Sequence, residues 1–291
     1  MLLLGALLAA RAGAAPSPVA TFSDVDGNVT VLRGGAEVDG EEDMDLFQGD
    51  EVRPDAGGGA TITFLDDHFV TLGERTTLTL KVITANPARG TFFGRVVLTT
   101  GKLFANFARL TTAGSGFQVA TGTAVAAVKG TTFAVEADGG VSTVAVTEGT
   151  VATAGLDAQG REQAPVAVGP GQESTVAAMA HPPSPAAPIG ARHGWVRARL
   201  DGIRAAAEHH RGLRRSGDLH RLRQLRRRAR EGTLDTGADP EARAFLAAHP
   251  EEREHLSRCG ERHRRIQERR GLRQKARQER RDVRQERRRK K

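Results

Sequence analysis

Three residues with metal-binding side chains are adjacent in the sequence, at Asp66, Asp67 and His68. Carboxylate oxygens and an imidazole nitrogen are common ligands of divalent metals. The same residue types are also typical of a tight turn between two strands, in which the aspartates are solvated. The turn is the favoured interpretation, so we expect no metal site here. A second acidic stretch, DVDGN at 24–28, is similar to the start of a calcium loop, but Gly35 occupies the place of the glutamate at position 12.

A group of histidines lies in the C-terminal third of the chain. The adjacent His209 and His210 would face different sides of a helix, and His255 and His263 are eight residues apart, more than two helical turns. Weak metal binding by a His-rich helix is the chemical alternative, but solvated histidines are the favoured interpretation. The group comprises His209, His210, His220, His249, His255 and His263.

The sequence contains no constellation that is typical of catalysis. Ser115 lies between two glycines, but neither a G-x-S-x-G motif nor a following helix surrounds it. The chain has no G-x-x-x-x-G-K-[ST] phosphate loop and no G-x-G-x-x-G motif that enters a helix. Cys259 is the single cysteine, so neither an intramolecular disulfide nor a cysteine-based zinc site can form. We therefore expect a protein that is not an enzyme and that has no cofactor.

Lys129 is a further candidate for chemistry, within the stretch GTAVAAVKGTTFAVE at 122–136. Small apolar residues occupy both faces of the expected strand before it, which is typical of a strand buried on both sides. Gly130 then permits a turn or bulge, after which Phe133 is expected to point into the core. Lys129 is accordingly interpreted as a side chain that leaves the edge of the core toward solvent.

The elements that would position these residues are short strands. From 19 to 178 the sequence alternates period-2 apolar segments with turns rich in Gly, Asp and Asn, which predicts an all-β domain. The lack of helical periodicity between them disfavours a parallel sheet made of βαβ units. Because the apolar residues are mainly Val, Ala, Leu and Phe, the expected core is narrow, as in a solenoid-like domain or flattened stacked β-sheets.

Charge divides the chain into an acidic and a basic part. Residues 1–191 contain 11 Lys and Arg against 20 Asp and Glu, a net charge of −9, whereas residues 192–291 contain 32 against 15, a net charge of +17. The basic part is therefore expected to meet an anionic partner. The Pro-rich stretch at 179–191 is expected to be an extended linker between the two parts.

The basic part at 192–291 is expected to be helical and partly disordered. Asp239 and Pro240 are typical of a helix start, and three apolar residues would follow them on one face. Dense guanidinium groups suit phosphate or carboxylate, although no aromatic residue lies between them to stack on bases. A solvated helix with partial Glu–Arg pairing is the open alternative. The candidate anion-binding residues are Arg226, Arg227, Arg228, Arg269, Arg270, Arg280, Arg281, Arg287, Arg288 and Arg289.

The N-terminal residues 1–15 are expected to be a signal-peptide-like segment. Met1–Ala10 is apolar, and small residues allow cleavage near Ala14 or Ala15, although the usual positive start is missing. The alternative is a short apolar start of a cytosolic protein. No later stretch of the sequence approaches the ~20 apolar residues that span a bilayer.

A series of glycine-containing motifs runs in order across 19–176. They include Leu46-x-x-Gly49-Asp50, Gly101-Lys102-Leu103, Val128-Lys129-Gly130-Thr131-Thr132-Phe133, Glu148-Gly149 and Val168-x-Pro170-Gly171. With these motifs the β-region resembles the FecR domain family. The resemblance implies an all-β, solenoid-like extracytoplasmic domain that works by protein contacts and signal relay. Iron-signalling members carry an anti-sigma region and a membrane span ahead of this domain, so this chain is expected to be a free-standing exported member.

From the residue types themselves, the motif positions are interpreted as architectural. Turns need glycine at positive φ, and aspartate side chains bond turn amides. These positions are Gly49, Asp50, Gly101, Gly130, Thr131, Phe133, Glu148, Gly149 and Gly171.

Two functions are consistent with these observations. The first is an exported, non-enzymatic interaction and signalling module of the bacterial cell envelope, whose basic tail contacts anionic envelope polymers, lipid headgroups or a partner protein. The alternative is a cytosolic nucleic-acid-associated protein whose Arg-rich tail binds the phosphate backbone.

Overall fold

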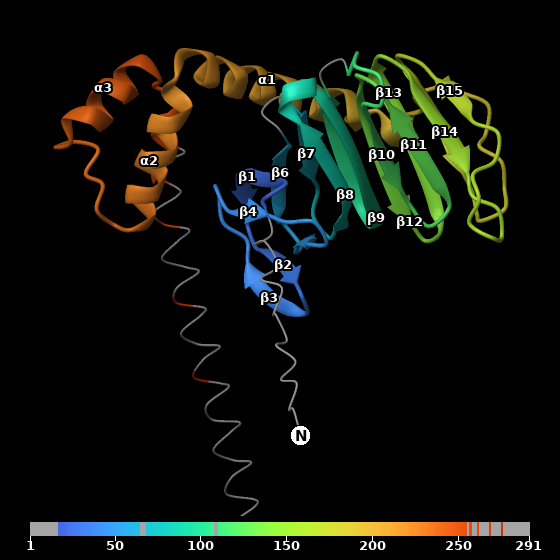
Figure 1. The fold of residues 1–291 in the computed structure, drawn as a ribbon, viewed down its shortest axis with the longest axis horizontal. Helices are drawn as coiled ribbons and strands as arrows, with labels where there is room; N and C mark the ends of the chain where they lie inside the picture. Colours follow the sequence, from blue (N-terminus) through green and yellow to red (C-terminus); the bar gives the residue numbers. More distant parts are fainter. Residues whose placement is uncertain are drawn as a thin grey trace, which may run out of the picture.

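The computed structural model describes residues 17–64, 68–107, 110–254 and 256–257, together with the single residues Glu261, Glu268 and Lys275. In this part of the chain strands come first and helices follow (Figure 1). The predicted all-β domain with a helical region after it is thereby confirmed. No helix within these residues is long and apolar enough to cross a membrane.

Two β-sheets face each other and share one long strand, β9 (Thr91–Phe107). Sheet A contains, in spatial order, β4 (Asp45–Leu46), β1 (Ala20–Asp26), β6 (Gly59–Phe64), β7 (His68–Leu72), the second part of β9, β12 (Thr132–Asp138), β13 (Val141–Glu148), β16 (Gln172–Val176) and β17 (Ala187–Pro188). Sheet B contains β3 (Ala36–Asp39), β2 (Val29–Arg33), β5 (Glu51–Pro54), β8 (Thr77–Asn86), the first part of β9, β10 (Gly116–Ala120), β11 (Ala124–Val128), β14 (Val151–Gly155) and β15 (Val166–Val168).

The shared strand β9 passes from one sheet to the other at Gly101. Its φ there is +97°, a backbone conformation that favours glycine. The Lys102 amide then donates to the Thr76 hydroxyl at 3.0 Å, and that hydroxyl lies 3.3 Å from the Lys102 carbonyl oxygen, which holds the bend. Because the chain returns to sheet B beside the start of β9, β10 pairs with β9 in parallel without a crossover helix.

The hydrophobic core fills the space between the two sheets, because alternate residues of each strand point inward. Four phenylalanines are fully buried, and the remaining core is mostly Val, Leu and Ala, which agrees with the narrow core expected from the sequence. Phe133 lies in this core, as predicted. The four phenylalanines are Phe22, Phe64, Phe117 and Phe133.

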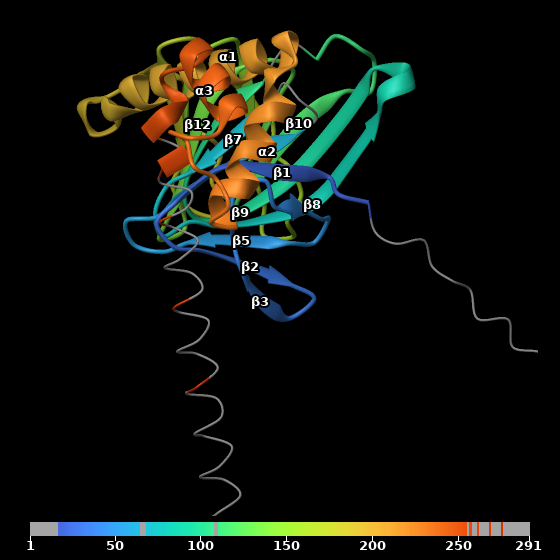
Figure 2. The same ribbon diagram turned by 90° about the vertical axis from the view of Figure 1, so that its left-hand side faces the viewer.

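The β8–β9 hairpin extends beyond the other strands of the sandwich (Figure 2). Its tip is a short 3-10 helix, η1 (Pro87–Arg89). From Val82 to the tip, β9 is the only strand of the described part of the chain that pairs with β8. The hairpin therefore gives β9 a length that reaches from this projecting tip into the centre of sheet A.

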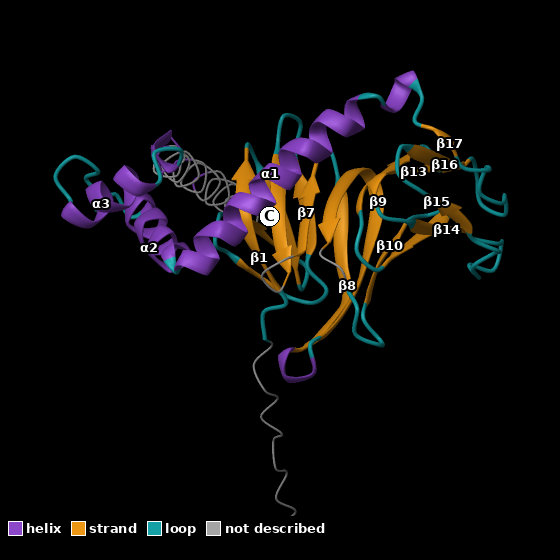
Figure 3. Cartoon of the chain, turned by 90° about the horizontal axis from the view of Figure 1, so that it is seen from above, coloured by secondary structure: helices purple, strands orange, loops and turns teal. Residues whose placement is uncertain are grey.

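The helices begin with η2 (Ala191–His193) and α1 (Trp195–Ser216), and α1 lies across the outer face of sheet A (Figure 3). Gly217, with φ of +80°, separates α1 from α2 (Asp218–Arg230). α3 (Pro240–Ala248) begins as predicted, because the Asp239 carboxylate accepts a hydrogen bond from the Ala242 amide at 3.0 Å.

The end of α1, α2, α3 and the residues after α3 bury an apolar cluster of their own. The leucines of α2 recur at three-residue intervals and face this cluster, although arginines surround them in the sequence. The described helical residues are therefore packed together and against the sandwich, which the sequence did not lead us to expect. The cluster consists of Leu213, Leu219, Leu222, Leu225, Ala242, Phe245, Leu246 and Leu256.

The Pro-rich stretch at 179–191 lies along the edge of sheet A. The Ser184 amide donates to the Thr175 carbonyl at 2.8 Å, and the Ser174 hydroxyl donates to the Ser184 carbonyl at 2.7 Å. β17 then pairs with β16. The stretch thus delivers the chain to the start of α1 while it remains bound to the sheet.

Candidate functional site

The outer face of sheet A carries a shallow apolar patch, here called the seat, formed by Phe104, Ala134 and Ala145. The strand register places these residues side by side across β9, β12 and β13. Glu173 of β16 continues the same row. Ala134 and Ala145 point away from the main core, and their small size leaves room for a helix to approach the sheet closely.

Three residues of α1 fill the seat. Val196, Leu200 and Ile203 follow the i, i+4, i+7 spacing that places side chains on one face of a helix. All three are buried against the seat, and Leu200 has no exposed surface. We call residues 191–257 the arm, because the seat and the contacts described next attach them to the sandwich.

The arm is held at its start by His193, which lies between two carboxylates of sheet A. Its Nδ1 is 2.9 Å from Glu173 Oε2, and its Nε2 is 3.4 Å from Glu136 Oε2. The Lys102 ammonium lies 3.6 Å from the other oxygen of Glu136. The His193 side chain is only 10% exposed, so this contact is largely removed from water.

Two arginines attach the middle of α1. Arg204 Nη1 lies 3.6 Å from Glu148 Oε2 at the end of β13, and both side chains are exposed by more than half. Arg211 Nη2 donates to the Asn106 Oδ1 of β9 at 2.6 Å, and its guanidinium lies over the Phe69 ring. The first pair contributes little to stability because solvent screens it, whereas the second contact involves a buried asparagine.

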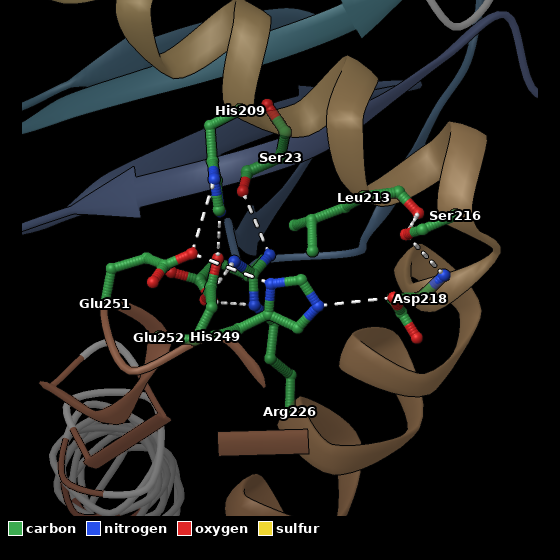
Figure 4. Close-up of polar contacts among 10 residues, drawn as sticks. Ser23, His209, Leu213, Ser216, Asp218, Arg226, His249, Glu251 and Glu252 are labelled. Carbon is green, nitrogen blue, oxygen red and sulfur yellow. Dashed lines mark hydrogen bonds and ion pairs between the residues drawn. The ribbon is translucent and has the colours of Figure 1, made fainter. Parts of the chain in front are cut away.

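The arm is held at its far end by Arg226 of α2, whose side chain is 7% exposed (Figure 4). Its Nη1 donates to the Ser23 carbonyl of β1 at 3.3 Å, and its Nη2 donates to Glu252 Oε2 at 3.4 Å. Its Nε lies 4.0 Å from Glu42, which is buried in the loop after β3. Nearby, Arg223 pairs with Asp43 at 3.9 Å.

Two histidines extend this group within the arm (Figure 4). His209 Nε2 lies 2.9 Å from the same Glu252 that receives Arg226, and His249 Nε2 lies 3.2 Å from Asp218. Glu251 lies 3.6 Å from both histidines. Hydrogen bonds from Ser216 and His249 hold the pKa of Asp218 below its ordinary value of 3.8. These contacts tie the residues after α3 to α1 and α2.

The ion pairs between arm and sandwich all have the same polarity. In each described pair the arm supplies a histidine or arginine side chain and the sandwich supplies the carboxylate, from His193 at one end to Arg226 at the other. Opposite charges across an interface favour one mode of docking and disfavour others. Arg204, Arg223 and Arg226 of the basic part thus meet carboxylates of the acidic sandwich of the same chain.

Of the described histidines of the arm, His193 contacts the sandwich, whereas His209 and His249 contact acidic residues of the arm. His220 contacts Gln224 at 2.8 Å on the exposed side of α2. No group of three or more His, Cys, Asp or Glu side chains in the described ranges could hold a metal ion. The His210 side chain, His255 and His263 lie outside the described residues, as does Cys259.

The acidic turn after β6 is only partly described. β6 and β7 pair as an antiparallel hairpin in which Phe64 is opposite His68, while Asp66 and Asp67 lie outside the described residues. His68 is buried, with its ring 4.9 Å from that of Phe107 and stacked on it. Ser115 is also buried, and its hydroxyl accepts a hydrogen bond from the Phe92 amide at 3.2 Å.

The first motif pair, Gly49 and Asp50, closes the turn between β4 and β5. The Gly49 amide donates to the Leu80 carbonyl at 2.7 Å. The buried Asp50 carboxylate accepts from the Phe47 amide at 2.9 Å and from the Arg33 guanidinium at 2.7 Å. These contacts join the turn to β2 and β8, and Asp50 faces the inside of the turn.

The motif residues after β11 and β13 meet each other. Gly130 has φ of +131° and Gly149 has φ of +81°, and a Cβ on Gly149 would come within 2.6 Å of the Gly130 carbonyl oxygen. The Thr131 hydroxyl donates to the Thr150 carbonyl at 3.2 Å. Glu148 differs from these residues, which contact one another within the sandwich: its exposed carboxylate lies near Arg204 of the arm.

Two motif glycines remain, together with Lys129. Gly171 has φ of +75°, and its amide donates to the Val146 carbonyl at 2.8 Å, while Gly101 forms the bend of β9. The Lys129 side chain is exposed, in agreement with the interpretation that it leaves the core toward solvent.

The candidate anion-binding arginines divide into three groups. Arg226 is committed to the internal contacts described above. Arg227 pairs with Glu231 at 2.9 Å, and Arg228 contacts Asp239 and, at 3.8 Å, Glu241. The others lie outside the described residues: Arg269, Arg270, Arg280, Arg281, Arg287, Arg288 and Arg289.

The seat was not recognised from the sequence, although a signal for it exists. The outward-facing positions of a strand such as β12 or β13 are normally polar when solvent covers that face. Ala134 and Ala145 are outward-facing but apolar. A sheet position that is small and apolar on its outer side indicates that another element covers it. The partner stripe of α1 was hidden by the surrounding arginines.

Comparisons with known proteins give one family match. Residues 50–152 match the family model described as "FecR protein". Two crystal structures, at 1.65 and 2.50 Å resolution, of "a putative anti-sigma factor" from Parabacteroides distasonis ATCC 8503 are 19% identical to this chain, with a TM-score of 0.39. The match covers 49% of this chain and 61% of that chain. A comparison with curated proteins finds no match.

Proposed function

We propose that this chain, whose residues 50–152 match the FecR family model, is a non-enzymatic interaction and signalling module of the bacterial cell envelope. FecR domains belong to a regulatory family. The proposed module works through protein contacts made by the sandwich and by the arm that is docked on it. The observation that supports this most directly is the interface between arm and seat, which has the features of a protein–protein interface within one chain.

That interface has a small apolar centre and a polar surround, as recognition surfaces do. The centre is the seat with Val196, Leu200 and Ile203, and charged contacts follow on both sides of it. The motif positions that were considered for chemistry close turns and hold strand ends, as the contacts of Asp50 illustrate. These polar residues therefore stabilise the sandwich, and the proposed binding surface is the face that the sandwich presents to the arm.

We further propose that residues 1–15 direct export and are removed near Ala14 or Ala15. The apolar run and the small residues that follow it support this proposal. The test is expression in a Gram-negative host, cell fractionation, and N-terminal sequencing of the purified protein. A mature N-terminus near residue 15 or 16 in the periplasmic fraction is the expected result, and a full-length chain in the cytosol would exclude an exported module.

The basic residues beyond 257 are proposed to contact an anionic component of the envelope or a partner protein. Their arginine content supports binding to phosphate or carboxylate groups. The full chain and a chain that ends at 257 can be compared for binding to vesicles with and without anionic lipid. Binding to anionic vesicles that is lost on truncation is expected; tight, salt-dependent binding to duplex DNA by an uncleaved cytosolic protein would instead favour the nucleic-acid alternative.

A further inference from the structure

The outer face of sheet A recognises a helix by two separate features. One is the apolar seat, which receives residues at i, i+4 and i+7 of α1. The other is a line of carboxylates around the seat, with Glu136 and Glu173 at one end and Glu148 beside the middle of the helix. A helix that fits this face must combine a short apolar stripe with basic residues on its flanks.

The middle of α1 meets both requirements with a small contact, while His193 and Arg226 hold the two ends of the arm. Three apolar side chains enter the seat, and the pair Arg204–Glu148 is exposed to solvent. Exposed ion pairs contribute little to stability and are weakened by salt. The side of α1 that faces away from the sheet includes the exposed Asp201 and Arg215. The contact between the middle of α1 and the seat is therefore small, and a second helix with the same pattern would make the same contacts.

The covalent connection favours the docked arm. The stretch at 179–191 keeps α1 next to the sheet, which gives the arm a high effective concentration at the seat. Backbone hydrogen bonds of Ser184 and Ile189 and the β16–β17 pairing hold that stretch on the edge of the sheet. A competing helix in solution must therefore overcome this local concentration to displace α1 from the seat.

We propose that the outer face of sheet A is a docking site for a basic amphipathic helix of a partner protein, and that α1 occupies this site within the chain until the partner's helix displaces it. This inference rests on the proposed function, since it names the class of partner that an interaction module with this face would bind. The charge complementarity of the described contacts carries it: the sandwich supplies carboxylates at every described ion pair with the arm.

The test uses the full chain with a specific protease site inserted between Ser184 and Pro185, both of which are exposed in the stretch before α1. Cleavage removes the covalent connection without deleting the arm. The probes are fluorescent peptides, read by anisotropy. One has the sequence of residues 191–216. A second is unrelated except for apolar residues at the positions of Val196, Leu200 and Ile203, and basic residues at those of His193, Arg204 and Arg211.

Both peptides are expected to bind the cleaved chain, and to bind the uncleaved chain more weakly by on the order of 100-fold, because the tethered arm competes. Binding should weaken as salt is raised. A version of the second peptide with acidic residues at its three basic positions should not bind. If neither peptide binds the cleaved chain, whether its own arm is released or stays bound, the inference is overturned.

The location of binding is tested with a matched pair of variants on outward-facing alanines. Ala145→Trp fills the seat on sheet A, whereas Ala152→Trp changes an exposed position on sheet B. Ala145→Trp should abolish peptide binding and increase trypsin cleavage within α1 of the uncleaved chain, and Ala152→Trp should do neither. Equal binding by both variants would place the peptide elsewhere and overturn the inference.

Failure of this inference can be told apart from failure of the proposed function. Loss of peptide binding together with a correctly exported, processed protein would discard the helix site and leave the envelope module in place. A full-length cytosolic protein would discard the module, whatever the peptides do.

Discussion

The Arg226 guanidinium donates a hydrogen bond to the backbone carbonyl of Ser23, a residue 203 positions earlier in the chain. The contact joins α2 to the first strand of the sandwich. Glu42 and Glu252 surround the same guanidinium, so one buried cation connects the sandwich, α2 and the residues after α3. Since its partners are buried, this arginine fastens the end of the arm.

Arg226→Met should therefore destabilise the docked arm by about 3–5 kcal/mol, because it removes a buried guanidinium that lies between the buried carboxylates of Glu42 and Glu252. Urea unfolding monitored by circular dichroism measures the effect. Arg227→Met is the matched control, since the Arg227 side chain is 76% exposed and pairs only at the surface; its unfolding midpoint should not change. Equal midpoints for the two variants would show that Arg226 does not fasten the arm.

Gly130→Val should destabilise the sandwich by about 1–3 kcal/mol, because a β-branched residue is strained at φ of +131°. The neighbouring Lys129→Gln changes an exposed side chain and should leave the unfolding midpoint unchanged. Thermal unfolding of the two variants decides the matter. An equal loss in both would mean that the hinge and the surface position have been confused.

Gly101→Ala should cost more than Gly139→Ala, although both glycines have positive φ. A Cβ at Gly101 would lie 2.5 Å from Thr76 Cα, whereas nothing lies within 4 Å of a Cβ at Gly139. The Gly139 variant measures the cost of the backbone conformation alone, about 1 kcal/mol. The difference in unfolding free energy between the two variants then reports the less favourable φ of +97° at Gly101, against +55° at Gly139, together with the contact with Thr76.

The start of α3 should depend on pH through Asp239. Hydrogen bonds from the Ala242 amide, and secondarily from Arg228, lower the pKa of this carboxyl from its ordinary value of 3.8. The contribution is therefore fully present above about pH 4 and is lost as the pH falls through the lowered pKa. Asp239→Asn keeps a capping side chain but cannot ionise, so its stability deficit should shrink as the pH is lowered from 5 to 3. Melting curves of both proteins over this range provide the measurement, and a deficit that stays constant would contradict the assignment.

The sandwich was predictable because strand periodicity and turn residues are local signals. Asp239 before Pro240 likewise marked a helix start that the structure contains. The docking of α1 was not predictable in this way. Outward-facing alanines such as Ala134 and Ala145 indicate that some element covers them, but not whether that element is a helix or a second sheet. Arg226 shows the same limit: among adjacent arginines, only tertiary packing decides which one is buried.

The parallel pairing of β9 and β10 was also missed, for a topological reason. Parallel strands normally require a helical crossover. The sequence shows no helical periodicity between the strands, so no parallel pair was predicted. In the structure β9 is long enough to belong to both sheets, and the chain returns to pair with its first part. The length of β9 could have indicated this pairing, but Gly101 is a typical turn residue and made the segment look like two strands.

The length of β9 has a mechanical consequence. Its first residue, Thr91, adjoins the projecting hairpin tip, and its last part, from Leu103 to Phe107, lies beneath the arm. The projecting tip and the seat residue Phe104 therefore belong to one strand, so a shift of the tip along the strand direction and a shift of Phe104 are coupled through β9. The bend at Gly101 lies between these two parts of the strand.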